Sequence, residues 1–120
     1  MTQAEEELMW QLEHDYWLCS MGGRRQSTDA SSIAVFGGAA HAVTGDALER
    51  AHAHGPEYEH VELTQRAYAR PSVGVAVLGY TVVARDRENR RKKMVCTSVW
   101  LRRNGIWTHI QHQQSLQDTA

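Results

Sequence analysis

The sequence is poor in cysteine and proline, and it has no long hydrophobic run. Its 120 residues include two cysteines, Cys19 and Cys96, and two prolines. Two cysteines so far apart form neither a disulfide framework nor the closely spaced pair of a zinc site. No apolar stretch approaches the roughly 20 residues that span a bilayer, and no apolar segment follows a basic start. We therefore expect a reduced, cytoplasmic protein without membrane contact.

An excess of charge of either sign is also missing. The chain has 13 Lys and Arg against 14 Asp and Glu, a formal net charge of -1, which gives no general attraction to nucleic acid. The basic run Arg90–Lys93 has no interleaved aromatics and is more typical of a protected sheet edge than of a nucleic-acid site. The length and the hydrophobic share of 42% predict one globular domain over residues 1–120, with a core that needs no metal or disulfide.

The hydrophobic pattern predicts two helices followed by long strands. A helix over residues 3–21 places Leu8, Leu12, Tyr16 and Cys19 on one face and leaves Glu13 and Asp15 for solvent. Turn residues separate the remaining segments, which are a strand Ser32–Phe36, a helix Thr44–His54 and the strands Tyr58–Ala69, Val73–Arg85, Arg90–Arg103 and Ile106–Ser115. Helices first and strands afterwards predict an α+β fold, a curved antiparallel sheet with the helices on one face.

The last two strands form a hairpin around Asn104-Gly105, a dipeptide that favours a two-residue turn. Uninterrupted pairing from this turn sets one group of side chains on the core face: Val95, Thr97, Val99, Leu101, Ile110, His112 and Gln114. The opposite face then carries Met94, Trp100, Trp107 and His109. Clustered aromatic side chains on a sheet usually mark a partner surface, so we predict a homodimer through this outer face. The alternative is a monomer whose tryptophans lie over arginine side chains.

Two segments carry a family resemblance: "TSVWLRRNGIWTHIQHQQS" over residues 97–115 and "YWLCSMGGR" over residues 16–24. Together with the order of elements, they resemble the nuclear transport factor 2-like superfamily, and within it the SnoaL-like branch of small bacterial domains. The resemblance implies a cystatin-like, cone-shaped fold in which a curved sheet wraps the N-terminal helices and leaves an internal pocket. Members include isomerases, dehydratases, cyclases and non-catalytic association domains, so the fold leaves the function open.

His112 is the first candidate for chemistry, because it faces the pocket in the predicted register and an imidazole acts as acid or base near neutral pH. Tyr16 stands where, by resemblance, ketosteroid isomerases place a hydrogen-bond donor. We expect a small-molecule ligand to contact Trp17, Thr97, Val99, Ile110 and Gln114. The alternative roles are structural, with the His112 ring bonded at the pocket rim and Tyr16 a core aromatic.

The sequence departs from the isomerase pattern elsewhere. Val99 stands in the position of the second donor, and "IAVFGGAAHAV" over residues 33–43 holds no aspartate base. Loss of one such donor removes on the order of 3 kcal/mol of transition-state stabilisation, which disfavours ketosteroid isomerisation.

Metal and cofactor sites are not expected. His52 and His54 are two apart on a helix, and His109 and His112 are three apart on a strand, so the members of each pair point different ways. Three functions stay open: small-molecule binding without assured catalysis, an enzyme of the isomerase, dehydratase or cyclase type using His112, and a non-catalytic dimerisation module.

Overall fold

The computed structural model describes residues 3–18, 27–37, 41–55 and 57–117. The described elements follow the predicted order, with one short strand, Val43–Thr44, that was not predicted. The first strand begins four residues earlier than predicted and the strand from Tyr58 ends three residues later, whereas the next two strands begin one or two residues later. In chain order the elements are α1 (Gln3–Leu18), β1 (Thr28–Val35), β2 (Val43–Thr44), α3 (Gly45–His54), β3 (Tyr58–Ser72), β4 (Val75–Asp86), β5 (Arg91–Arg103) and β6 (Ile106–Leu116). Cys19 and the predicted end of the first helix lie outside the described residues.

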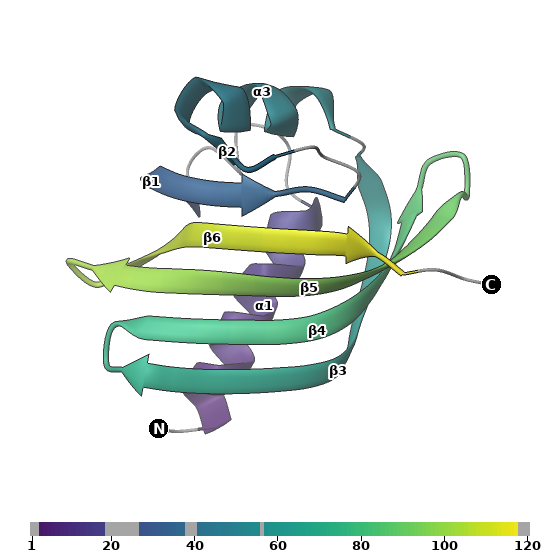
Figure 1. Cartoon of the computed structure of the whole chain (residues 1–120). Helices are drawn as coiled ribbons and strands as arrows, with labels where there is room; N and C mark the ends of the chain where they lie inside the picture. Colours follow the sequence, from purple (N-terminus) through teal and green to yellow (C-terminus); the bar gives the residue numbers. More distant parts are fainter. Residues whose placement is uncertain (1–2, 19–26, 38–40, 56, 118–120) are drawn as a thin grey trace.

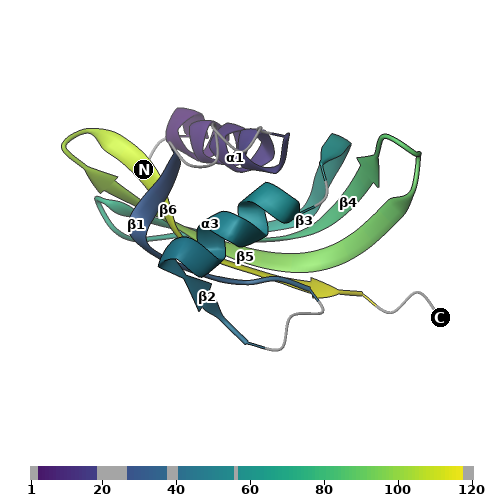
Figure 2. The ribbon, with the colours of Figure 1, turned by 90° about the horizontal axis from the view of Figure 1, so that it is seen from above.

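The six strands form one sheet in the order β2-β1-β6-β5-β4-β3. Figure 1 shows this order, with α1 crossing one face of the sheet and α3 beside β1 and β2. Both helices lie on the concave side of the curved sheet (Figure 2). The predicted α+β class is confirmed. The sheet is mixed rather than wholly antiparallel, because β1 runs parallel to β6, and the long chain between them provides the crossover that parallel pairing needs.

Helix α1 buries a different face from the predicted one. Its buried residues are Met9, Trp10, Glu13, Tyr16 and Trp17, whereas Leu8 is 48% exposed. These five positions also follow the three-and-four spacing of one helical face, with Glu13 at its centre. The expectation that Glu13 points to solvent is therefore wrong.

The β5–β6 hairpin begins in the predicted register and then shifts. Arg103 pairs with Ile106 around Asn104 and Gly105, which both adopt positive φ as the two-residue turn requires. A bulge follows, because Val99 pairs with Gln111 while its neighbour Trp100 pairs with His109. The bulge leaves Ile110 as the extra residue on β6 and turns both His109 and His112 to the concave side. Residues beyond it pair one position away from the prediction.

The predicted faces of β5 are reversed. Met94 and Trp100 are each 1% exposed and belong to the core, and His109 is also 1% exposed. These side chains are covered by the chain itself, so their assignment to a dimer interface is corrected. The pairing beside the turn is the predicted one, so the error lies in which face of the hairpin was assigned to the core, and the bulge in β6 then brings His112 back to that face.

Trp107 lies against arginine side chains, as the alternative interpretation of a monomer predicts. It is half-buried against the core, and the guanidinium carbons of Arg70 and Arg102 each lie 5.3 Å from the centre of its ring. Cation–π contact of this kind accounts for the indole without a second copy.

No helix among the described residues has both the length and the apolar character needed to cross a membrane.

Candidate functional site

A carboxylate with no exposed surface lies at the centre of the concave side. Glu13 of α1 is 0% exposed and accepts three hydrogen bonds from the sheet. Trp100 Nε1 and Ser98 Oγ each donate over 2.7 Å, and the Tyr80 hydroxyl donates a third, short bond. Burial of a charge is costly unless it is hydrogen-bonded, and these donors supply that stabilisation. Trp17 Nε1 in turn donates to the Tyr80 hydroxyl over 2.8 Å.

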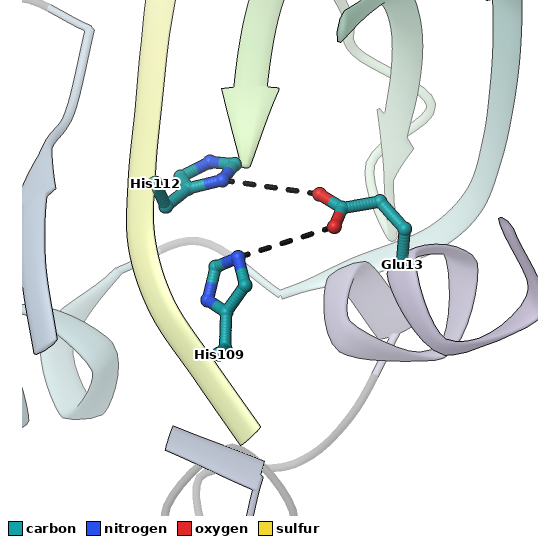
Figure 3. Close-up of side chains that lie close together, drawn as sticks. All are labelled: Glu13, His109 and His112. Atoms are coloured by element: carbon teal, nitrogen blue, oxygen red, sulfur yellow. Dashed lines mark ion pairs between the residues drawn. The ribbon is translucent and has the colours of Figure 1, made fainter. Parts of the chain in front are cut away.

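Two histidines of β6 approach the same carboxylate. His109 Nε2 and His112 Nδ1 each lie 3.9 Å from a Glu13 oxygen (Figure 3). The Ser98 hydroxyl sits among these groups, 3.0 Å from His109 Nε2 and 2.8 Å from His112 Nδ1. Glu13, Ser98, His109 and His112 are hereafter called the Glu13 network.

The protons of the Glu13 network can be assigned by counting. A hydroxyl has one hydrogen and accepts two bonds, and the Ser98 hydrogen is directed to Glu13. His109 Nε2 and His112 Nδ1 therefore carry the hydrogens of their bonds to Ser98. On the other side of the ring, His112 Nε2 lies 3.0 Å from the Gln114 side-chain oxygen. In the imidazolium, Nε2 carries a hydrogen and donates it to the Gln114 oxygen. In the neutral ring Nε2 is an acceptor, and rotation of the Gln114 amide by half a turn presents its N–H to that nitrogen instead.

A cavity of about 290 Å³ adjoins His112. Its wall comes from the end of α1, the residues just after β1, α3, the start of β3, the start of β5 and the end of β6. The lining residues are Tyr16, Trp17, Phe36, Gly37, Ala51, His52, His54, Gly55, Tyr58, Lys92, Met94, His112, Gln114 and Leu116. The wall is mainly aromatic and apolar, with a few polar groups, as is usual for small-molecule sites.

Four of the predicted site residues line this cavity: His112, Tyr16, Trp17 and Gln114. The Tyr16 hydroxyl has a partner there, His52 Nε2 at 2.8 Å. Thr97, Val99 and Ile110 are not among the lining residues. Thr97 and Val99 point to the opposite face because alternate side chains of β5 do so, and Ile110 is the bulged residue.

Sequence reasoning missed Glu13 and Ser98. Glu13 could have been found from the helical face it shares with Met9, Trp10 and Trp17, since a carboxylate inside an apolar stripe is buried with its partners. Nothing local singled out Ser98, because its place beside both histidines depends on the bulge in the next strand.

Burial sets the ionisation of several groups around Glu13. Desolvation, helped by the nearby Glu13 charge, raises the pKa of Tyr80 well above its usual value, so the phenol stays a donor. The same two causes raise the pKa of Cys96 to about 12, which makes it an unreactive thiol. Desolvation, with His112 and His52 nearby, lowers the pKa of His109 well below its usual value.

Glu13, His109 and His112 also have the chemical types of a metal-ligand set, with ligand atoms within 4.8 Å of one another. The prediction that His109 and His112 point in opposite directions is therefore wrong, because the bulge turns both side chains to the concave side. The Ser98 hydroxyl, however, hydrogen-bonds all three side chains and occupies the space between them. An ion there would have to displace this hydroxyl, so the geometry fits a proton network better than a metal centre.

Comparison with known proteins finds similarity in structure only. No family model and no curated protein matches the chain. A Parabacteroides distasonis protein with a provisional ketosteroid isomerase assignment superposes with a TM-score of 0.81 at 18% identity, over 94% of this chain and 88% of that one. The association domain of calcium/calmodulin-dependent protein kinase II from Caenorhabditis elegans superposes with a TM-score of 0.75 at 14% identity, over 94% of this chain and 96% of that one. A nuclear transport factor 2-like protein from Cytophaga hutchinsonii superposes with a TM-score of 0.75 at 13% identity, over 98% of this chain and 100% of that one.

These similarities define the class of fold. The chain has the nuclear transport factor 2-like fold, as the sequence resemblance predicts. At such identities the similarity defines no activity, and the neighbours themselves include an isomerase assignment and an association domain.

We predict that Glu13→Gln lowers the free energy of unfolding by about 3 kcal/mol, because an amide presents N–H to buried donors. Glu7→Gln, on the exposed side of the same helix, is the matched control and should change little. Urea denaturation of the three proteins measures both values. Equal midpoints for Glu13→Gln and Glu7→Gln would show that the carboxylate is not a structural centre.

Stability should also fall on acidification below about pH 6.5. The pKa of His109 is lowered in the folded state from its usual 6.5, so between the two pKa values the unfolded chain binds a proton at His109 and the folded chain does not. Stability is complete above the unfolded pKa and falls as the pH drops toward the folded pKa, by at most about 1.4 kcal/mol per pH unit. Denaturation at stepped pH should give a smaller slope for His109→Gln, and an unchanged slope for His60→Gln at an exposed position. Identical slopes for all three would contradict this assignment.

Proposed function

We propose that the chain binds a small molecule in the cavity beside His112 and exchanges a proton with it through that imidazole. The observation that carries the proposal is the double environment of His112. One ring nitrogen is held by Ser98 in front of the buried Glu13 carboxylate, and the ring itself forms part of the cavity wall. A buried imidazole oriented by a carboxylate on one side and facing a pocket on the other is suited to general acid–base chemistry.

The chemistry follows from the proton count. When the ligand displaces the Gln114 amide from Nε2, neutral His112 accepts a proton from the ligand at that nitrogen while Nδ1 keeps its hydrogen bond to Ser98. The imidazolium formed is stabilised by Glu13, whose oxygen lies 3.9 Å from Nδ1. Return of the proton to a different ligand atom completes an isomerisation without any other reactant. Glu13 and Ser98 are positioning residues here, since they act through His112.

The ketosteroid isomerase assignment of one structural neighbour supports this class of reaction. Among the described lining residues no carboxylate is available as a base, and of the histidines there we choose His112 because it lies beside the buried Glu13 carboxylate. Ketosteroids themselves stay disfavoured as substrates, because Val99 stands in place of the second hydrogen-bond donor and residues 33–43 hold no aspartate base. The SnoaL-like branch and the cytoplasmic location remain predictions from the sequence.

A fragment screen by saturation-transfer NMR tests the proposal. Fragments that bind near the Trp17 indole should lose at least about tenfold in affinity in His112→Ala, because the polar anchor of the cavity is removed. His60→Ala is the matched control and should retain binding. Fragments that bind wild type and His112→Ala equally would contradict the assignment of His112.

Self-association is a second candidate function, favoured by the outer face of the sheet. Half-exposed aliphatic side chains lie side by side there on β4 and β5, with Val75 opposite Leu101 and Val77 opposite Val99, and Val95 is 45% exposed. Contiguous apolar surface of this kind is common at interfaces. Association domains among the structural neighbours support the same function.

We predict that the wild-type chain sediments as a dimer at micromolar concentration and that Val95→Lys sediments as a monomer, because a charge would be buried at the interface. Val73→Lys is the control, since Val73 is 72% exposed in the β3–β4 turn. A monomeric wild-type protein, or a dimer unaffected by Val95→Lys, would exclude this surface.

A further inference from the structure

We propose that the cavity selects a small organic acid, bound with its carboxylate at the rim beside Lys92 and with its uncharged end at His112. This inference rests on the small-molecule function proposed above and names the ligand class. The ionisable side chains among the described lining residues, tyrosines aside, are Lys92, His52, His54 and His112, and none of them is acidic.

Lys92 is available for a ligand. Its neighbours Arg87 and Arg90 form ion pairs with Glu57 and with Asp86, respectively. Within the described part of the chain, Lys92 has no such carboxylate partner, although it lines the cavity and is exposed at the start of β5. Among the described residues, therefore, no carboxylate forms an ion pair with the Lys92 ammonium group, which is exposed at the edge of the cavity.

The strand register places this charge at the opposite end of the cavity from His112. Lys92, Met94, Cys96 and Ser98 follow one another along the concave face of β5, and Ser98 pairs with His112. The six steps along the backbone from Lys92 to Ser98 span about 20 Å at the usual rise of a strand. A ligand that fills the space between them meets a cation at one end and an imidazole at the other.

The buried carboxylate determines the orientation of the ligand. Glu13 lies behind His112, where poor solvation leaves its negative charge weakly screened. An anionic group at the base of the cavity would be repelled by Glu13, whereas the same group at the rim is attracted by Lys92. Between the ends, the wall is formed by Trp17, Phe36, Tyr58 and Met94. These side chains favour a flat or aliphatic body, so the chemistry is that of an aromatic or short alkyl carboxylic acid.

Matched acids and amides test the inference on the full chain. Cinnamate and cinnamamide, and octanoate and octanamide, are titrated at low salt while the Trp17 indole and His112 ring resonances are followed. Each acid should bind about fivefold more tightly than its amide. Lys92→Gln should remove this preference. Lys93→Gln makes the same charge change on the opposite face of β5 and should leave the preference intact.

The remaining outcomes separate this inference from the function on which it rests. Equal binding of acid and amide, lost in His112→Ala, would overturn the acid selectivity and leave the proposed function standing. An equal loss of preference in Lys92→Gln and Lys93→Gln would also overturn it, because the preference would then reflect surface charge in general. If neither acids nor amides shift the Trp17 and His112 resonances, both the inference and the proposed function are overturned.

Discussion

The buried carboxylate of Glu13 is the constraint on which the rest of the structure depends. A fully buried carboxylate needs hydrogen-bond donors, and these come from Tyr80 on β4 and from Ser98 and Trp100 on β5. Satisfying the three donors at once allows only one rotation of α1 over the sheet. The same requirement brings the end of the helix, with Trp17, against the strands that form the cavity wall. The interaction that docks the helix thus also builds the site.

The bulge at Ile110 connects this constraint to function. In a regular strand two histidines three residues apart would lie on opposite faces, but one extra residue turns both inward to the Ser98 hydroxyl. His109 is fully enclosed and has a lowered pKa, so it serves the network as a neutral donor. His112 lies one step nearer the open end, where its ring reaches the cavity. Two residues of the same type therefore have different roles, set by their depth.

The sequence allowed the order of elements, the Asn104-Gly105 turn and the fold resemblance to be predicted, because these depend on local pattern and turn chemistry. Four of the fourteen residues that line the cavity were predicted too, namely Tyr16, Trp17, His112 and Gln114. The core-facing side of β5 was not predictable, because both of its faces carry apolar side chains and the register at the turn does not show which face meets the helices. Glu13 was misplaced because a charged residue is usually exposed, and only its donors, distant in sequence, make burial favourable.

Fold, network and cavity together describe a pocket with His112 in its wall beside the buried Glu13 and with Lys92, which has no carboxylate partner among the described residues, at its edge. The central claim is that Glu13 and Ser98 hold His112 with its hydrogen on Nδ1. Nitrogen-15 NMR of the histidine rings measures this directly. We expect a protonated Nδ1 on His112 and a protonated Nε2 on His109, with both signals shifted in Ser98→Ala. An unprotonated Nδ1 on His112 would contradict the network and the proton transfer built on it.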